Sequence, residues 1–295
     1  MQRFHAVYLH IGKLWWEINY WAPKANRHKP KKIVITYADR RPLYTLNPED
    51  LFIPLEKFLS HERLREAYYK DYEENRKLEQ EIIEELEKKY DIAHILTPQR
   101  RIKYMSDFRI HRKKPNYDPK LRKLVGLPPY NIIIASKEMG WEPKKWESMR
   151  DNLKNLTGAT TIICGNYHEL KEIGIEDSPI YKVPIEQGMN MLSYIAKYSF
   201  YYVSTSQGSA SLGLLFLVPI LCFMNNKSEL KYTEIYNLRR NPVNFLQTND
   251  INIANKFINH SLYHEFGKEL VARTKNRLQI EFRIESDKNR LSPYD

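Results

Sequence analysis

The chain has 295 residues, and its 47 Lys and Arg against 36 Asp and Glu give a formal net charge of +11. An apolar content of 42% and an aromatic content of 13% are enough for hydrophobic cores, so wholesale disorder is excluded. The mean hydropathy of −0.62 and the lack of a long apolar run argue against a transmembrane helix. No signal-peptide pattern is visible, and we expect a cytoplasmic protein of one large or two ordinary domains.

The basic charge alone fits three kinds of partner: nucleic acid, an anionic membrane surface or a phosphorylated substrate. Cys164 and Cys222 each lie in an apolar run, which predicts buried thiols and no disulfide. The nine histidines are scattered along the chain, with His260 and His264 as a lone pair at four-residue spacing, and we expect no metal site and no cofactor.

In the first part of the chain, short apolar runs alternate with helical patterns. The runs, at 5–11, 32–38, 51–55 and 90–96, predict strands, with helices at 13–22, at 60–89 and from 98 onward. The stretch 60–90 has apolar residues at three- and four-residue spacing, which predicts one long amphipathic helix. A coiled-coil partner is one interpretation of this helix; packing on its own sheet is favoured, because its tyrosines make a poor coiled-coil seam.

Most of the excess charge lies in one segment, 97–123, where ten cations stand against two acids. We expect this segment to contact an anionic partner, through Arg100, Arg101, Lys103, Arg109 and Arg112.

A second series of elements follows a Gly and Pro-rich break at 120–130. Apolar runs at 131–136, 160–165, 180–185, 201–205 and 218–223 alternate with helical patterns at 143–156, 167–173, 188–198 and 207–216. Ile- and Val-rich strands alternating with helices predict parallel sheets covered on both faces. The expected fold class is α/β, with two doubly wound, Rossmann-like domains facing a cleft. We place them at 1–125 and 126–262, followed by a helical tail at 263–295.

Three groups of residues stand where predicted strands turn into helices. The stretch 203–221 has a Ser, Gln and Gly turn at a helix start, which suits either a phosphate or simple helix capping. The stretch 136–146 brings lysines to the same edge of the sheet, where ordinary surface lysines are the simpler interpretation. In the first domain, Glu17 adjoins two tryptophans. Partial burial there would raise its pKa toward that of a general base, but an acid in a first helical turn, favoured by the helix dipole, is the simpler interpretation.

Taken in chain order, the three groups resemble the motifs of glycosyltransferase family 9, the ADP-heptose:lipopolysaccharide heptosyltransferases, which have the GT-B fold. The matching stretches are LHIGKLWWEI after the first strand, KKYDIAHIL, Lys144 to Trp146, GNYHE at Gly165 to Glu169, and a turn from Ser206 to Leu212 followed by Pro219. The chain resembles a divergent member of this family, because it departs from the family's motifs at several positions. Serines replace the Asp and His of the family's diphosphate turn, and Trp15 or Trp16 occupies the position of its catalytic Asp, with Glu17 as the nearest acid.

The resemblance implies a donor diphosphate held by Lys144, Ser206, Gln207, Gly208 and Ser209, with Glu169 and Met189 beside the nucleoside. It also implies Glu17 as the base. The expected activity is a metal-independent, inverting transfer of a hexosyl or heptosyl group from a nucleotide-diphosphate sugar to an anionic glycan or glycolipid of the cell surface, such as lipopolysaccharide. No DxD motif is present, and the basic segment would face the acceptor or the inner face of the membrane.

Three other functions stay open at this point. Tyr104, Phe108 and Tyr117 are interspersed with the cations of 97–123, as in a groove for single-stranded nucleic acid, although no nucleic-acid-binding motif surrounds them. A catalytically silent protein that only binds nucleotide sugars is the second, and an epimerase of the same fold is the third.

Overall fold

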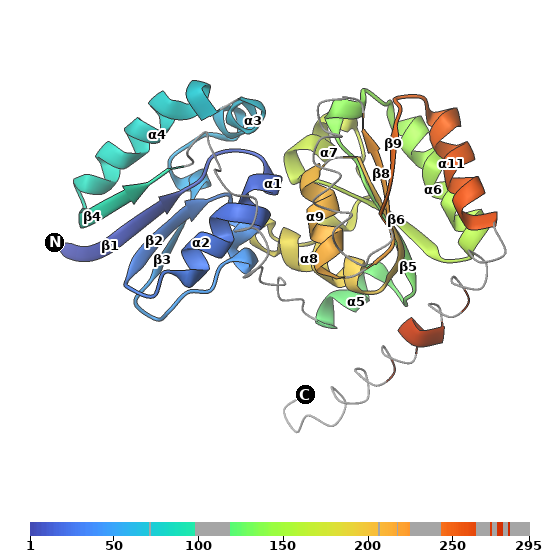
Figure 1. Cartoon of the computed structure of the whole chain (residues 1–295), viewed down its shortest axis with the longest axis horizontal. Coiled ribbons are helices and arrows are strands. Elements are labelled where there is room, and N and C mark those ends of the chain that lie inside the picture. The colour runs from blue at the N-terminus through green and yellow to red at the C-terminus, as the bar shows by residue number, and fades with distance from the viewer. Residues whose placement is uncertain are drawn as a thin grey trace. The chain divides into compact units, whose positions relative to one another are not determined.

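The structure is a computed structural model of the whole chain. It describes residues 1–70, 72–97, 119–205, 207–216, 218–224, 243–263, 272, 276–279 and 283. The chain divides into two compact units, each with its own parallel sheet (Figure 1). Unit 1 comprises Met1–Asn116 and Ile185–Met189, and unit 2 comprises Tyr117–Pro184 and Asn190–Asp295. The α/β class with two Rossmann-like units is therefore confirmed.

Unit 1 is built on four parallel strands. They are β1 (Gln2–Leu9), β2 (Lys32–Thr36), β3 (Leu51–Pro54) and β4 (Tyr90–Leu96), in the order β3-β2-β1-β4. All four predicted strands are confirmed, with shifts of a few residues at their ends. Every residue of β2 is buried, because helices cover both faces of the sheet, and this burial explains its unbroken Ile-Val-Ile run.

One face of the unit 1 sheet packs on a short helical segment and the other on a longer pair of helices. The short segment consists of α1 (Leu14–Trp16), a π-helical stretch η1 (Glu17–Trp21) and α2 (Ala22–Arg27), and the pair is α3 (His61–Tyr69) and α4 (Tyr72–Glu87). Successive side chains of β1 point to opposite faces of the sheet. Tyr8 stacks edge-on against Trp21 at 5.9 Å, while Val7 and Leu9 join the cluster that contains Leu64 and Ile82.

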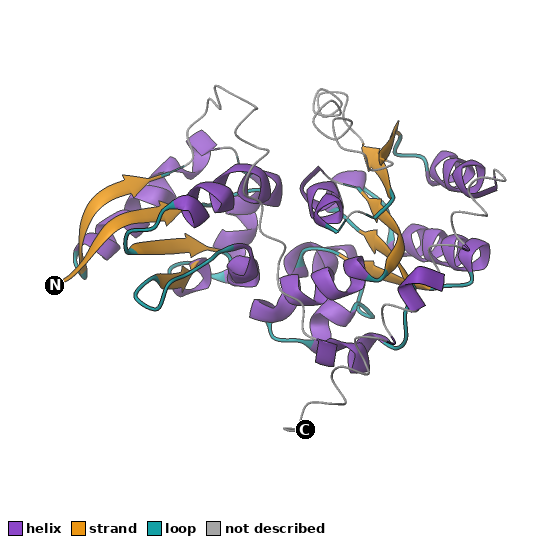
Figure 2. Ribbon diagram, turned by 60° about the horizontal axis from the view of Figure 1, so that its bottom comes forward, coloured by secondary structure: helices purple, strands orange, loops and turns teal. Residues whose placement is uncertain are grey.

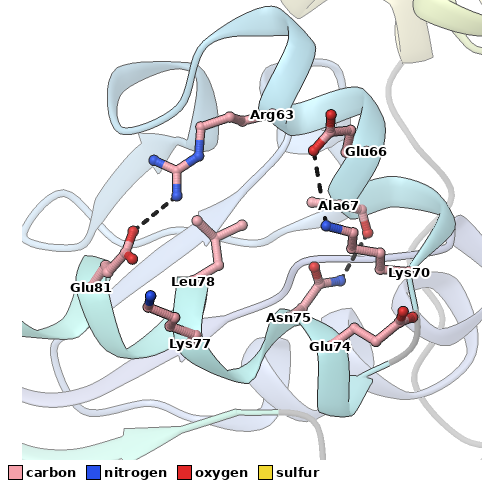
Figure 3. A pocket seen from close by; sticks show the side chains of 9 residues that line it. All are labelled: Arg63, Glu66, Ala67, Lys70, Glu74, Asn75, Lys77, Leu78 and Glu81. Atoms are coloured by element: carbon pink, nitrogen blue, oxygen red, sulfur yellow. Dashed lines mark hydrogen bonds and ion pairs between the residues drawn. The ribbon is translucent and has the colours of Figure 1, made fainter.

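The expected single helix over 60–89 is wrong, because the segment forms a helical hairpin. The Arg63 guanidinium lies 2.9 Å from the Glu81 carboxylate, and Asn75 Nδ2 donates to the Ala67 carbonyl at 2.8 Å (Figure 3). These pairs run in opposite directions, so α4 returns along α3. The favoured interpretation, packing on its own sheet, is confirmed by the buried Leu64, Ala67, Ile82 and Leu86 in the core of unit 1.

Unit 2 has five parallel strands with helices on both faces (Figures 1 and 2). The strands are β5 (Tyr130–Ile134), β6 (Thr160–Cys164), β7 (Ser199–Ser204), β8 (Ile220–Met224) and β9 (Val243–Gln247), in the order β6-β5-β7-β8-β9. The helices are α5 (Arg122–Val125), α6 (Pro143–Thr157), α7 (Tyr167–Ile173), α8 (Gly188–Lys197), α9 (Gln207–Leu215) and α11 (Ile251–Tyr263). Figure 1 shows α6 and α11 on one face of this sheet, with α7 and α9 on the other.

Short 3-10 turns complete the described elements. They are η2 (Ala38–Leu43), η3 (Leu55–Lys57), η5 (Pro119–Leu121), η6 (Lys137–Met139), η7 (Pro179–Lys182) and η8 (Ile185–Gln187). The apolar run at 180–185, expected as a strand, instead begins in η7, which starts at a proline. The expected helix from residue 98 and most of the expected tail at 263–295 lie outside the described residues.

The prediction for the cysteines is confirmed: Cys164 and Cys222 are fully buried thiols that form no disulfide. Cys164 lies on the edge strand β6 and Cys222 on the inner strand β8 of unit 2, and burial raises the pKa of Cys164 well above its usual value. Both thiols therefore act as small apolar side chains of the core. None of the described helices is long and apolar enough to span a membrane.

Candidate functional site

The strand order of unit 2 identifies one edge of its sheet as the place for a ligand. The chain passes from β5 outward to β6 and then returns to β7 on the other side of β5. All five strands are parallel, so the direction of winding reverses between β5 and β7. In open α/β sheets, ligands bind beyond the carboxyl ends of the strands at such a point.

Hydroxyl groups line the chain at this reversal. Thr205, directly after β7, donates its hydroxyl to the carbonyl of Ile134 at the end of β5, at 2.7 Å. The hydroxyls of Ser204 and Ser209 are 2.5 Å apart and join the end of β7 to the first turn of α9. The two strand ends and the start of α9 are therefore held together by side-chain hydrogen bonds.

The neighbouring turn adds a buried carboxylate to the same edge. Ser136, two residues after β5, donates to Glu169 Oε1 at 3.3 Å, and Glu169 is only 7% exposed. The predicted residues Ser209 and Glu169 thus lie in the first turns of α9 and α7, the helices that follow β7 and β6. Lys144 is exposed in the first turn of α6, which follows β5 along the chain.

Two glycines allow helices to approach this edge closely. A Cβ on Gly165 would lie 2.8 Å from the carbonyl oxygen of Ala135, so the turn after β6 fits against the end of β5 only without a side chain. A Cβ on Gly213 would lie 2.9 Å from the ring of Tyr202. Glycine at these positions therefore fixes α7 and α9 against the sheet.

Some of the remaining predicted site residues lie within the described part of the structure and others lie outside it. Ser206 lies outside the described residues, as do the basic residues Arg100, Arg101, Lys103, Arg109 and Arg112. Gln207 and Gly208 form the first turn of α9. Met189 is 1% exposed in α8 and is grouped with unit 1.

In unit 1, Glu17 is fully buried among polar partners at the end of β1. It forms an ion pair with Arg40, accepts a hydrogen bond from the Tyr44 hydroxyl at 2.6 Å, and has an oxygen 3.4 Å from His10 Nδ1. Arg40 also donates to the Gly12 carbonyl at 2.9 Å. Gly12 has a φ of 147°, which favours glycine, so this turn is adapted to present its carbonyl to Arg40.

The expected pKa change at Glu17 is wrong in sign. Burial alone raises the pKa of this carboxyl, but Arg40 and His10, together with the Tyr44 hydroxyl, outweigh burial and lower the pKa to about 2. Glu17 is therefore a firmly ionised carboxylate and a weak proton acceptor at neutral pH. Glu17 is also the first residue of the π-helical turn η1, and such turns are frequent at functional sites.

Two further carboxylates lie beside this cluster and were missed from sequence. Asp39 Oδ1 is 4.0 Å from Arg40 Nε, and 22% of the Asp39 side chain is exposed. Both carboxylate oxygens of Glu56 accept from the backbone N–H of Ala38, at 3.1 and 3.0 Å. The signal available in the sequence was weak: an Asp shortly after a buried strand, with nothing to connect it to Glu17.

Comparison with known proteins gives little beyond the general arrangement. No family model matches the chain, and no curated protein matches its sequence. One similar solved structure is the glycosyl transferase family 9 protein from Veillonella parvula DSM 2008, with a TM-score of 0.43 and 13% identity over 95% of this chain and 97% of that one. At these values the likeness establishes neither a family nor an activity for this chain.

Proposed function

We propose that this protein is a glycosyltransferase that moves a sugar from a nucleotide-diphosphate donor to an anionic glycan or glycolipid. The reaction is metal-independent and inverts the configuration at the anomeric carbon. Two things support the proposal: the order of the motifs in the sequence, and the residues at the carboxyl edge of the unit 2 sheet.

The observation that carries the proposal is the hydroxyl-lined turn between β7 and α9. The turn follows a strand next to the reversal of the sheet, and Thr205 ties it to the adjacent strand. It leads into a nine-residue helix with no acidic residue in its first turn. The N–H groups at a helix start are available to an anion, and the helix dipole favours negative charge there.

This arrangement suits a leaving nucleoside diphosphate. Negative charge develops on the diphosphate as the bond to the sugar breaks, and backbone N–H groups that already point to it stabilise this charge without reorganisation. The exposed Lys144, in the first turn of α6 after β5, would add a cation. Glu169 would lie beside the nucleoside, where a carboxylate accepts hydrogen bonds from ribose hydroxyls.

Calorimetric titration tests the donor site. ADP, GDP, UDP and dTDP, and their hexose conjugates, are titrated into the full chain and into Gly208→Asp, which places a carboxylate in the first turn of α9. We expect one nucleotide class to bind the wild type, and Gly208→Asp to weaken that binding by about 10-fold or more, because like charges repel at short range.

Asn252→Asp is the matched control. It adds the same charge to an exposed position in the first turn of α11, which follows β9 at the far side of the sheet. This variant should bind as the wild type does. Absence of binding to all four nucleotide classes would contradict the donor site. Binding without transfer to any acceptor would select the silent, sugar-nucleotide-binding alternative.

A further inference from the structure

Asp39 occupies the carboxyl edge of the unit 1 sheet, next to the buried Glu17 cluster. It belongs to η2, which begins two residues after β2, and the Gly12 turn follows the neighbouring strand β1. The Asp39 side chain is 22% exposed, whereas that of Glu17 is 0% exposed. Of these two acids, only Asp39 presents its carboxylate to a molecule arriving from solvent.

The hydrogen bonds of the cluster leave the negative charge of Asp39 with little direct stabilisation by Arg40. The Arg40 guanidinium is committed to Glu17 and to the Gly12 carbonyl, with a contact of only 4.0 Å to Asp39. Both carboxylate oxygens of Glu56 are held by the N–H of Ala38, the residue before Asp39. One guanidinium thus stands near three carboxylates, and its contact with the partly exposed Asp39 is longer than its ion pair with the buried Glu17.

We propose that Asp39, and not Glu17, accepts the proton from the acceptor hydroxyl in the sugar transfer; this inference rests on the proposed function. The acceptor O–H bond breaks and its proton passes to a carboxylate oxygen of Asp39. The oxygen forms a bond to the anomeric carbon of the donor, and the bond from that carbon to the diphosphate breaks. The electron pair of that bond leaves with the nucleoside diphosphate. Glu17 acts as a positioning residue that holds Arg40 in place.

The electrostatics of Asp39 suit this task. Burial raises its pKa, Arg40 opposes the rise, and Glu56 and Glu17 add to it, so the pKa is about 7. Other titratable groups near this cluster are Tyr37 and Tyr68, whose rings lie 4.2 and 5.8 Å from the Arg40 guanidinium. Glu186, which belongs to the same unit, raises the pKa of Glu56. A proton acceptor is most effective when its pKa lies near the working pH, because it is then both ionised and reasonably basic.

The test compares Asp39→Asn with the wild type in donor binding and in turnover. Binding is measured by calorimetry with the four nucleoside diphosphates. Turnover is the release of nucleoside diphosphate from ADP-, GDP-, UDP- and dTDP-hexoses in the presence of octyl phosphohexosides, between pH 5 and 9. We expect Asp39→Asn to lower kcat by about 10²- to 10⁴-fold and to leave nucleotide binding unchanged. The wild-type loss of rate below about pH 7 should disappear in the residual activity of the variant.

Asp91→Asn is the control, because it makes the same substitution at an exposed position of β4 in the same unit. It should retain the wild-type rate and pH profile, and Asp39→Glu should recover part of the activity. If Asp39→Asn keeps the rate and the acid limb of an active wild type, the inference fails and the transferase proposal stands. If the wild type binds nucleotides but transfers no sugar, the transferase proposal fails and the inference falls with it.

Discussion

At Glu17, a fully buried carboxylate is tied to a guanidinium that is itself 2% exposed. Replacing Glu17 with Gln leaves the Arg40 charge buried without its partner, and we expect a loss of about 3–5 kcal/mol in the free energy of unfolding. Because the folded pKa of about 2 lies below the ordinary 4.5, this stabilisation is present above pH 4.5 and is lost as the pH falls toward 2. Urea unfolding between pH 3 and 7 measures both effects.

Glu85→Gln provides the comparison for that experiment. Its pair with Lys89 is exposed on α4, with carboxylate and ammonium side chains 46% and 58% accessible. An exposed pair contributes less than about 1 kcal/mol. Equal losses in the two variants would show that the Glu17 cluster contributes no more than a surface pair.

His28, at the opposite end of the same sheet, should give the free energy of unfolding a second dependence on pH. Burial lowers its pKa below 6.5, and the neighbouring His5 and Lys32 lower it further, while Asp50 opposes them. His28 therefore takes up a proton more readily when unfolded, so its stabilisation is present above pH 6.5 and is lost as the pH falls below it. His28→Gln should lose less stability than the wild type between pH 8 and 5.5 in urea titrations. His61→Gln, at an exposed position of α3, should behave as the wild type does.

At the level of elements, Gly213 sets two effects against each other in α9. Ala has the better helix propensity by about 1 kcal/mol, but its Cβ would lie 2.9 Å from the ring of the fully buried Tyr202 and 3.0 Å from Ile220. Overpacking of a close-packed core costs about 1–3 kcal/mol. We expect Gly213→Ala to lower the free energy of unfolding by about 1 kcal/mol and to weaken nucleotide binding, because α9 must move off the sheet. A net stabilisation in chemical unfolding would contradict this packing.

The elements that the sequence predicts best are those with a strong period and few alternatives. Strands β1 to β8 were predicted within a few residues, because buried strands demand Ile- and Val-rich runs, whereas β9 was not predicted. The hairpin of α3 and α4 was missed, since the apolar period continues through the turn and no Gly or Pro marks it. Tertiary contacts decide that turn, among them the hydrogen bond from Asn75 to Ala67.

In the candidate site, too, features set by local sequence could be predicted and features set by tertiary contacts could not. The serine-rich turn pointed to Ser209 and the family resemblance to Glu169, and both stay predictions as site residues; the parallel strands do bring their two βα turns to one edge. The sign of the pKa change at Glu17 was not predictable, because it depends on Arg40 and Tyr44, which lie 23 and 27 residues away along the chain. Asp39 was missed for the same reason, because its environment is set by charges that the sequence does not place beside it.

At the scale of the whole molecule, two units with separate sheets predict that a donor nucleotide protects only one of them. A ligand stabilises the part of the structure that binds it, by about 2.7 kcal/mol at 100 times its Kd. In hydrogen exchange with saturating nucleoside diphosphate, we expect slower exchange of amides at 134–137, 165–170, 204–205 and 207–213, which belong to the strand ends, turns and helices at the carboxyl edge of unit 2. The amides of β1 and β2 should exchange at the unliganded rate. Protection confined to unit 1 would place the nucleotide at the Glu17 edge instead. The site proposed at the β7–α9 turn would then be wrong, although both sheets would stand as described.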